Sequence, residues 1–192
     1  MALTLVTAPL IEPVTLAEAK DHLRVSIADD DDYITGLIAA ARRFVENDLG
    51  RALITQTWDL FLSEFPTVDE IEIPHPPLQS VTSLKYKNSA GTETTWAASN
   101  YIVDTNSEPG RIVLTYSNSW PTDTLYPANP ITIRFVAGYG DDRSDVDSGP
   151  LHATKLLISA WYENREPVLS GSVITKEIPL AYESLIWRNR VF

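Results

Sequence analysis

The sequence has 192 residues, of which 44% are hydrophobic and none is cysteine, and its formal net charge is −11, from 15 Lys and Arg against 26 Asp and Glu. This length suits one domain or one domain with a large insertion, and the apolar fraction is sufficient for a packed core. The missing cysteines exclude disulfides and thiolate metal sites and are compatible with folding in a reducing cytoplasm. A surface of this sign repels phosphate, which disfavours ordinary nucleic-acid binding but permits a protein that surrounds DNA without gripping it. The sequence has no apolar run of about 18 residues for spanning a bilayer and no basic start of a signal peptide.

The first part of the chain predicts an extended segment followed by a short helix. Residues 1–12 are apolar and β-branched. A helix is predicted from about residue 16 to residue 25, because Thr15 can cap its start and Glu18 stands three residues later, as in a capping box.

A longer amphipathic helix is predicted over residues 30–49, and Gly50 follows it as a left-handed stop. Four acids, Asp29 to Asp32, stand at its start. They could be metal ligands, but no spaced ligand set accompanies them. We therefore favour the interpretation that they offset the helix dipole and cap its free amides.

The hydrophobic period changes to alternation after Arg51, which indicates β-strands. Turn residues divide the block, and Asn88 to Gly91 are predicted to form the loop of a hairpin. The predicted strands cover residues 54–62, 69–73, 80–87, 92–96, 100–104, 111–116 and 131–136.

A third helix is predicted from Leu151 to Glu166, because Pro150 suits a helix start and Pro167 disfavours helical geometry before it. It is apolar over much of its girth, which indicates burial on most sides. The loop before it contains Asp145 and Asp147 at a spacing faintly similar to calcium loops. The glutamate that closes an EF-hand is missing, so a solvated loop is favoured.

The predicted fold class is α+β: a small helical bundle from residues 1–50 and 138–167, a β-rich insertion at 51–137, and a C-terminal tail at 168–192. The tail contains a predicted short helix from about residue 182 to 191. Its charge is +1 against −12 for the rest of the chain. The tail could dock onto another chain or fold back onto its own domain, and composition leaves both open.

The sequence predicts no catalytic, cofactor-binding or metal-binding residues. Its three histidines, His22, His75 and His152, are scattered, and no nucleophile elbow, phosphate-binding loop or zinc helix motif occurs. We therefore expect no enzymatic activity and no cofactor. Trp96 and Trp120 border turns, and ring stacking on a sugar remains an alternative for them.

Several short phrases, in this order and spacing, resemble the head–tail connector (adaptor, or head-completion) proteins of long-tailed phages (siphoviruses) and of related gene-transfer particles. The likeness covers nearly the whole chain. The phrases are Leu16–Arg24, Asp31–Ile34 with Ala39–Arg42, Gly50–Trp58, Pro76–Val81, Pro109–Ile112, Ala137–Gly140 and Trp161–Glu166.

The resemblance implies a structural virion protein at the head–tail interface, made in the host cytoplasm. It implies a ring of usually twelve copies beneath the portal protein of a DNA-filled head. The C-terminal tail would dock into the portal, a stopper or tail-completion protein would bind below, and DNA would pass through the lumen without specific binding. An acidic lumen would let a polyanion slide. No membrane contact is implied.

Two sets of site residues follow from this hypothesis. Trp and Arg are enriched at interface hot spots, and for portal docking we expect Ile174, Ile178, Tyr182, Ile186, Trp187, Arg188, Arg190 and Phe192. A ring needs a heterologous contact between unlike faces of each copy. For it we expect the exposed side of the second helix, with Arg42, Arg43, Glu46 and Asp48. The alternative function is a β-rich carbohydrate- or protein-binding module on a helical base.

Overall fold

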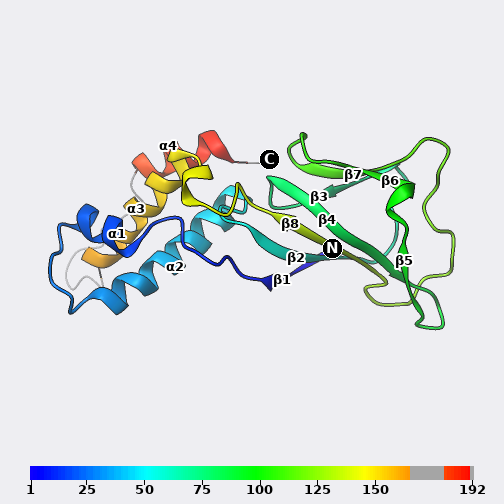
Figure 1. The fold of residues 1–192 in the computed structure, drawn as a ribbon, viewed down its shortest axis with the longest axis horizontal. Coiled ribbons are helices and arrows are strands. Elements are labelled where there is room, and N and C mark those ends of the chain that lie inside the picture. Colours follow the sequence, from blue (N-terminus) through cyan, green and yellow to red (C-terminus); the bar gives the residue numbers. More distant parts are fainter. Residues whose placement is uncertain (165–179, 191–192) are drawn as a thin grey trace, which may run out of the picture. The chain divides into compact units, whose positions relative to one another are not determined.

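The structure is a computed structural model that describes residues 1–164 and 180–190. Its contacts divide the chain into two compact units. The sheet unit comprises Met1–Leu10 and Thr55–Tyr139, and the helical unit comprises Ile11–Ile54 and Gly140–Phe192. The α-helices lie in the helical unit and the antiparallel sheets in the sheet unit, so the predicted α+β class is confirmed (Figure 1).

The sheet unit contains a five-stranded and a three-stranded antiparallel sheet within the described residues. Each of the seven predicted strands is confirmed, and so is the hairpin around Asn88 to Gly91. The five-stranded sheet has the order β1 (Ala2–Thr7), β2 (Gln56–Leu62), β8 (Ile131–Ala137), β4 (Leu78–Lys87) and β5 (Glu93–Trp96). The three-stranded sheet has the order β3 (Glu70–Ile73), β7 (Gly110–Leu114) and β6 (Tyr101–Asp104).

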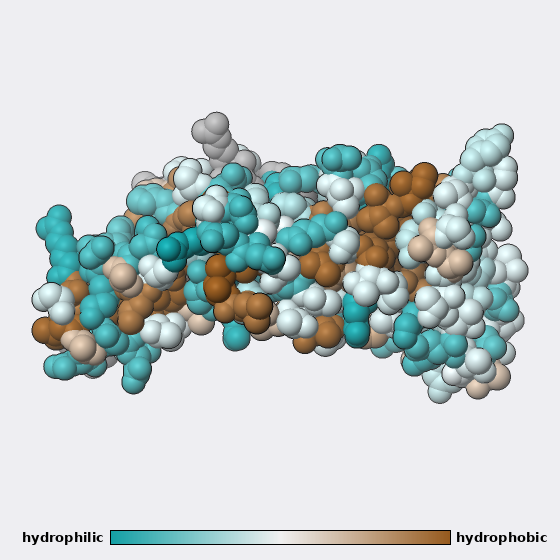
Figure 2. All heavy atoms as spheres, viewed as in Figure 1, coloured by the Kyte–Doolittle hydropathy of each residue, from teal (hydrophilic) through white to brown (hydrophobic). Residues whose placement is uncertain are grey.

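Strand β8 shows why the alternating pattern identifies these strands. Ile131, Ile133 and Phe135 are completely buried on one face, as expected for a sheet with one face on the core. On the other face Arg134 donates two hydrogen bonds, of 2.8 and 2.7 Å, to the Asp59 carboxylate on β2. Figure 2 shows hydrophobic residues gathered over strands of this unit on the side in view.

The helical unit contains α1 (Leu16–Leu23), α2 (Asp31–Leu49), α3 (Ser148–Glu163) and α4 (Leu180–Asn189). The capping box of α1 is confirmed, since Glu18 N donates to Thr15 Oγ1 over 3.2 Å and Thr15 N donates to Glu18 Oε2 over 2.9 Å. Gly50 ends α2 in the left-handed region with φ 67°. Apolar side chains from α2 and α3 form the core of the unit: Ile34, Ile38, Ala41, Val45, Leu49, Ala153, Leu157 and Ile158.

Helix α3 differs from its prediction at both ends. It begins at Ser148, so Pro150 occupies its first turn, where a missing N–H costs no helical hydrogen bond. It ends at Glu163, so the position of Pro167 does not set the end of the helix. There Asn164 closes the helix, because its backbone N–H and its side-chain amide both donate to the Ala160 carbonyl, over 3.2 and 2.7 Å.

The acidic loop before α3 uses its carboxylates to cap its own backbone. Ser144 N donates to Asp142 Oδ1 over 2.8 Å, and Asp142 N donates to Asp145 Oδ2 over 3.2 Å. The first of these bonds is the main cause that lowers the pKa of Asp142. A side chain at Gly140 would collide with the Asp145 carboxylate, so this close approach requires glycine.

No helix in the described part of the chain is long and apolar enough to cross a membrane.

Candidate assembly interface

The C-terminal helix α4 packs on α2 and α3 of its own chain. Its residues Tyr182 and Ile186 are only 1% and 4% exposed. The Tyr182 ring lies 6.1 Å from the ring of Phe44 on α2, and Phe44 in turn meets the Trp161 ring of α3 edge-on at 5.8 Å. These apolar contacts hold α4 on the body of the helical unit.

Polar contacts to Asp48 reinforce this packing. The Tyr182 hydroxyl donates to Asp48 Oδ2 over 3.0 Å, and an Arg190 guanidinium nitrogen lies 3.8 Å from Asp48 Oδ1. Burial raises the pKa of the Tyr182 hydroxyl well above its ordinary value, and the negative charge of Asp48 adds to that rise. Tyr182 therefore stays protonated and remains a donor.

Trp187 has the opposite character, since 70% of it is exposed on α4. Tryptophan is a residue type typical of interface hot spots. Of the remaining predicted docking residues, Ile174, Ile178 and Phe192 lie outside the described residues, and so does the side chain of Arg188. The structure thus brings together Tyr182, Ile186 and Trp187 on one short helix, and Arg190 directly follows its last residue.

The prediction that Arg42 and Glu46 lie on the exposed side of α2 is wrong. They are 5% and 7% exposed. Arg42 Nε donates to Glu12 Oε2 over 2.7 Å, and Arg42 NH1 donates to Glu46 Oε2 over 2.7 Å. Glu46 Oε1 also accepts the backbone N–H of Leu53 over 3.0 Å.

The electrostatics of Arg42 follow from this arrangement. Burial alone would lower the pKa of its guanidinium, but the charges of Glu46 and Glu12 outweigh burial and raise that pKa. The cluster is therefore an internal ion-pair network, and it connects the segments at Glu12 and at Leu53 to α2. Of the four predicted ring-contact residues, Arg43 is exposed and Asp48 is half-buried.

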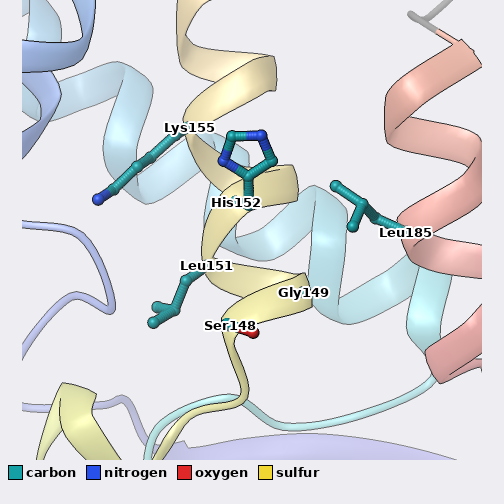
Figure 3. Close-up of a pocket in the computed structure, with 6 residues that line it drawn as sticks. All are labelled: Ser148, Gly149, Leu151, His152, Lys155 and Leu185. Atoms are coloured by element: carbon teal, nitrogen blue, oxygen red, sulfur yellow. The ribbon is translucent and has the colours of Figure 1, made fainter.

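A hollow of about 490 Å³ opens between the start of α3 and the middle of α4. Figure 3 shows Leu185 on α4 pointing toward α3 and His152, while Lys155 projects to another side of α3. The His152 ring lies 6.4 Å from the His22 ring of α1. Burial lowers the pKa of His22, and electrostatic repulsion from the neighbouring His152 and Lys155 side chains acts in the same direction.

The three histidines are far apart in the sequence, but the fold brings His22 and His152 close together. The third, His75, stacks on Trp58 in the sheet unit with ring centroids 4.7 Å apart. Within residues 1–164 and 180–190, no three His, Asp or Glu side chains form a group that could hold a metal ion.

Trp96 and Trp120 belong to an aromatic cluster in the sheet unit. The Trp120 ring stacks on Phe65 at 5.5 Å, and the Trp96 ring stacks on Tyr101 at 5.6 Å. The two tryptophans lie 5.3 Å apart, and Trp120 Nε1 donates to the Val68 carbonyl over 2.8 Å. Their ring faces are thus engaged by neighbours, which disfavours sugar stacking.

Sequence reasoning missed Glu12 and Phe44 as partners of these groups. Arg42 and Glu46 are four residues apart on one helix, so their pairing could have been found from spacing. Glu12 is 30 residues from Arg42, and Phe44 meets Tyr182 across most of the chain. Both contacts join residues far apart in the sequence, so no local sequence pattern predicts them.

A sequence profile of the family described as "Phage gp6-like head-tail connector protein" matches residues 13–108. No curated protein matches the chain.

Three solved structures are similar over the whole of this chain and 96% of each matched chain. One is from the neck of an empty GTA particle computed with C6 symmetry, with a TM-score of 0.80 and 28% identity. Another is from the virion of a native gene transfer agent (GTA) particle, with a TM-score of 0.80 and 27% identity. A third is from the neck of a native GTA particle computed with C12 symmetry, with a TM-score of 0.76 and 28% identity.

Proposed function

We propose, given that this chain belongs to the phage gp6-like head–tail connector family, that it is a non-enzymatic ring protein in the neck of a virion or gene-transfer particle. In this proposal twelve copies join the portal of the head to the stopper or tail-completion protein below. The observation that carries the proposal is the match of the whole chain to a neck chain at 28% identity and a TM-score of 0.80. The C12 symmetry of one matched neck supports the copy number.

The charge of the chain supports passage of DNA through the ring without specific binding. Proteins bind DNA largely because their cations release counterions from the phosphates. A chain with a net charge of −11 provides little of this effect, so DNA would not bind to the lining of the ring. Most cations among the described residues are paired with a carboxylate, as Arg111 is with Asp104 and Glu70.

We further propose that the C-terminal segment docks onto the portal, with α4 as its described part. Trp187 is the group that α4 offers outward, since it is 70% exposed. Tyr182 and Ile186 support docking indirectly, because their burial fixes the side of the helix from which Trp187 projects. Arg190 stands near the same end of α4 with nearly half of its side chain exposed.

The proposed function is tested by removing the gene from a particle-producing strain. We expect DNA-filled heads without tails, and we expect the purified wild-type chain to restore tail attachment when it is added to these heads. Electron microscopy scores the fraction of heads with tails. Normal tails in the absence of the chain would overturn the proposal.

Portal docking is tested by the Trp187→Ala variant against Tyr116→Ala. Tyr116 is completely exposed in the sheet unit, so its truncation is a matched loss of an exposed aromatic. We expect Trp187→Ala to join heads with at least about tenfold lower affinity, as hot-spot truncations do. Equal binding of the two variants would contradict docking through Trp187.

A further inference from the structure

Strand β1 forms one edge of the five-stranded sheet, and it pairs only with β2 within the described residues (Figure 1). The register runs from Ala2 opposite Phe61 to Thr7 opposite Thr57. The outer side of such a strand presents unpaired backbone N–H and C=O groups, which form a template for contact with another chain.

The β1 edge lacks most devices that protect edge strands in soluble proteins. Residues Ala2–Thr7 contain no charged side chain and no proline. Leu5 and Val6 are large apolar residues that are 39% and 43% exposed. The one irregularity is a register shift between Leu5 and Thr7.

The opposite edge of the same sheet, β5, is protected. It has four residues, and its first residue, Glu93, is paired with Lys85 over 2.9 Å and lies 4.0 Å from Lys87. Short length and charge are the usual means of blocking strand addition. The contrast between the two edges points to β1 as the edge that another chain covers.

We propose that the free edge of β1 is the contact through which each copy of this chain meets an unlike surface of the next copy in the ring. This inference rests on the proposed function, because it assumes the ring. The contact is heterologous, since pairing of β1 with another β1 would close a dimer and end the assembly.

Charge identifies a second copy of the chain as the occupant. Two copies that each carry −11 repel one another over most of their surfaces. The first eleven residues contain no charged side chain, so a second acidic copy can approach this strip without facing a carboxylate. Attraction to a basic foreign partner would instead favour an acidic strip.

The test compares Val6→Lys with Val68→Lys. Both valines are exposed, at 43% and 57%, and both belong to the sheet unit, but Val68 lies outside the β1 edge. Circular dichroism and thermal unfolding should match the wild type for both variants, because neither side chain is buried. We expect Val6→Lys to lower ring occupancy on tail-less heads by about tenfold or more, since it buries an unpaired charge at each contact, whereas Val68→Lys should assemble normally.

Cross-linking identifies the occupant directly. The chain has no cysteine, so Val6→Cys provides a single attachment point for a maleimide-linked photo-cross-linker. On assembled necks we expect a ladder of multiples of the 21.4 kDa chain, and Val68→Cys should give no ladder.

Two results would overturn the inference. One is normal ring occupancy with Val6→Lys, and the other is a Val6→Cys adduct to a protein of another mass. In both cases the wild type still joins heads, so the proposed function survives. If the wild type fails to join heads, the proposed function itself is wrong.

Discussion

The hydroxyl of Tyr182 on α4 donates a 3.0 Å hydrogen bond to Asp48 on α2, across 134 positions of sequence. Because Tyr182 is only 1% exposed, this bond ties the C-terminal helix to the body of the helical unit. We expect Tyr182→Phe to reduce the free energy of unfolding by about 1 kcal/mol, the net value of a typical hydrogen bond. Urea unfolding measures the change, and hydrogen exchange in α4 should accelerate with it. Tyr116→Phe, at a fully exposed position, is the control and should change nothing.

Arg42 should be among the most sensitive positions of the helical unit. Arg42→Ala leaves Glu46 buried without its cation and removes the partner of Glu12. Loss of one member of a buried ion pair costs about 3–5 kcal/mol, so we expect a loss of that size in the free energy of unfolding. Arg43→Ala, one residue away and exposed, should stay within about 0.5 kcal/mol of the wild type. Similar losses for both variants would contradict the buried network.

Asp104 should titrate at unusually low pH. Hydrogen bonds from the Ser107 hydroxyl, the Arg111 guanidinium and the Asn106 backbone lower the pKa of its carboxyl from 3.8 to about 2. A depressed folded-state pKa adds stability above the unfolded value and loses it as pH falls toward the folded value. The contribution of Asp104 is therefore lost between about pH 4 and pH 2. Carbon-detected NMR titration should give a pKa near 2 in the wild type and a value closer to 3.8 in Ser107→Ala. An unchanged pKa in that variant would refute the role of the hydroxyl.

Gly140 should tolerate no side chain while Asp145 is present. The added Cβ of Gly140→Ala would collide with the Asp145 carboxylate and disrupt its bond from Asp142 N. We expect a loss of about 1–3 kcal/mol in the free energy of unfolding, as for overpacked sites. Asp145→Ala removes the obstacle, so the loss caused by Gly140→Ala should shrink in the double variant. Additive losses in this double-mutant cycle would argue against the collision.

Local signals predicted much of the fold. The capping box at Thr15 and Glu18, the left-handed stop at Gly50 and the alternation in β8 each concern residues within a few positions of one another. Such patterns reflect backbone and burial preferences that act at short range. Within the described residues, they located β2 to β8 and helices α1 to α4 with errors of a few residues.

Contacts between distant segments were not predictable from these patterns. The extended start of the chain was grouped with the helices, yet Ala2–Thr7 pairs with β2, whose residues stand 50 to 59 positions later. Arg42 was placed on the exposed side because helical periodicity treats every charged residue as outward-facing, whereas Glu12 and Glu46 neutralise it inside. The packing of α4 likewise depends on Phe44 and Asp48, which no local pattern links to Tyr182.

The division of the chain into two units has a mechanical consequence. Residues 1–10 and 55–139 build one unit and residues 11–54 and 140–192 build the other, so the backbone crosses between them three times. Tension that pulls one unit from the other is shared among three peptide connections. A protease that cuts only the crossing after Leu10 would liberate no fragment at once, because β1 would stay hydrogen-bonded to β2.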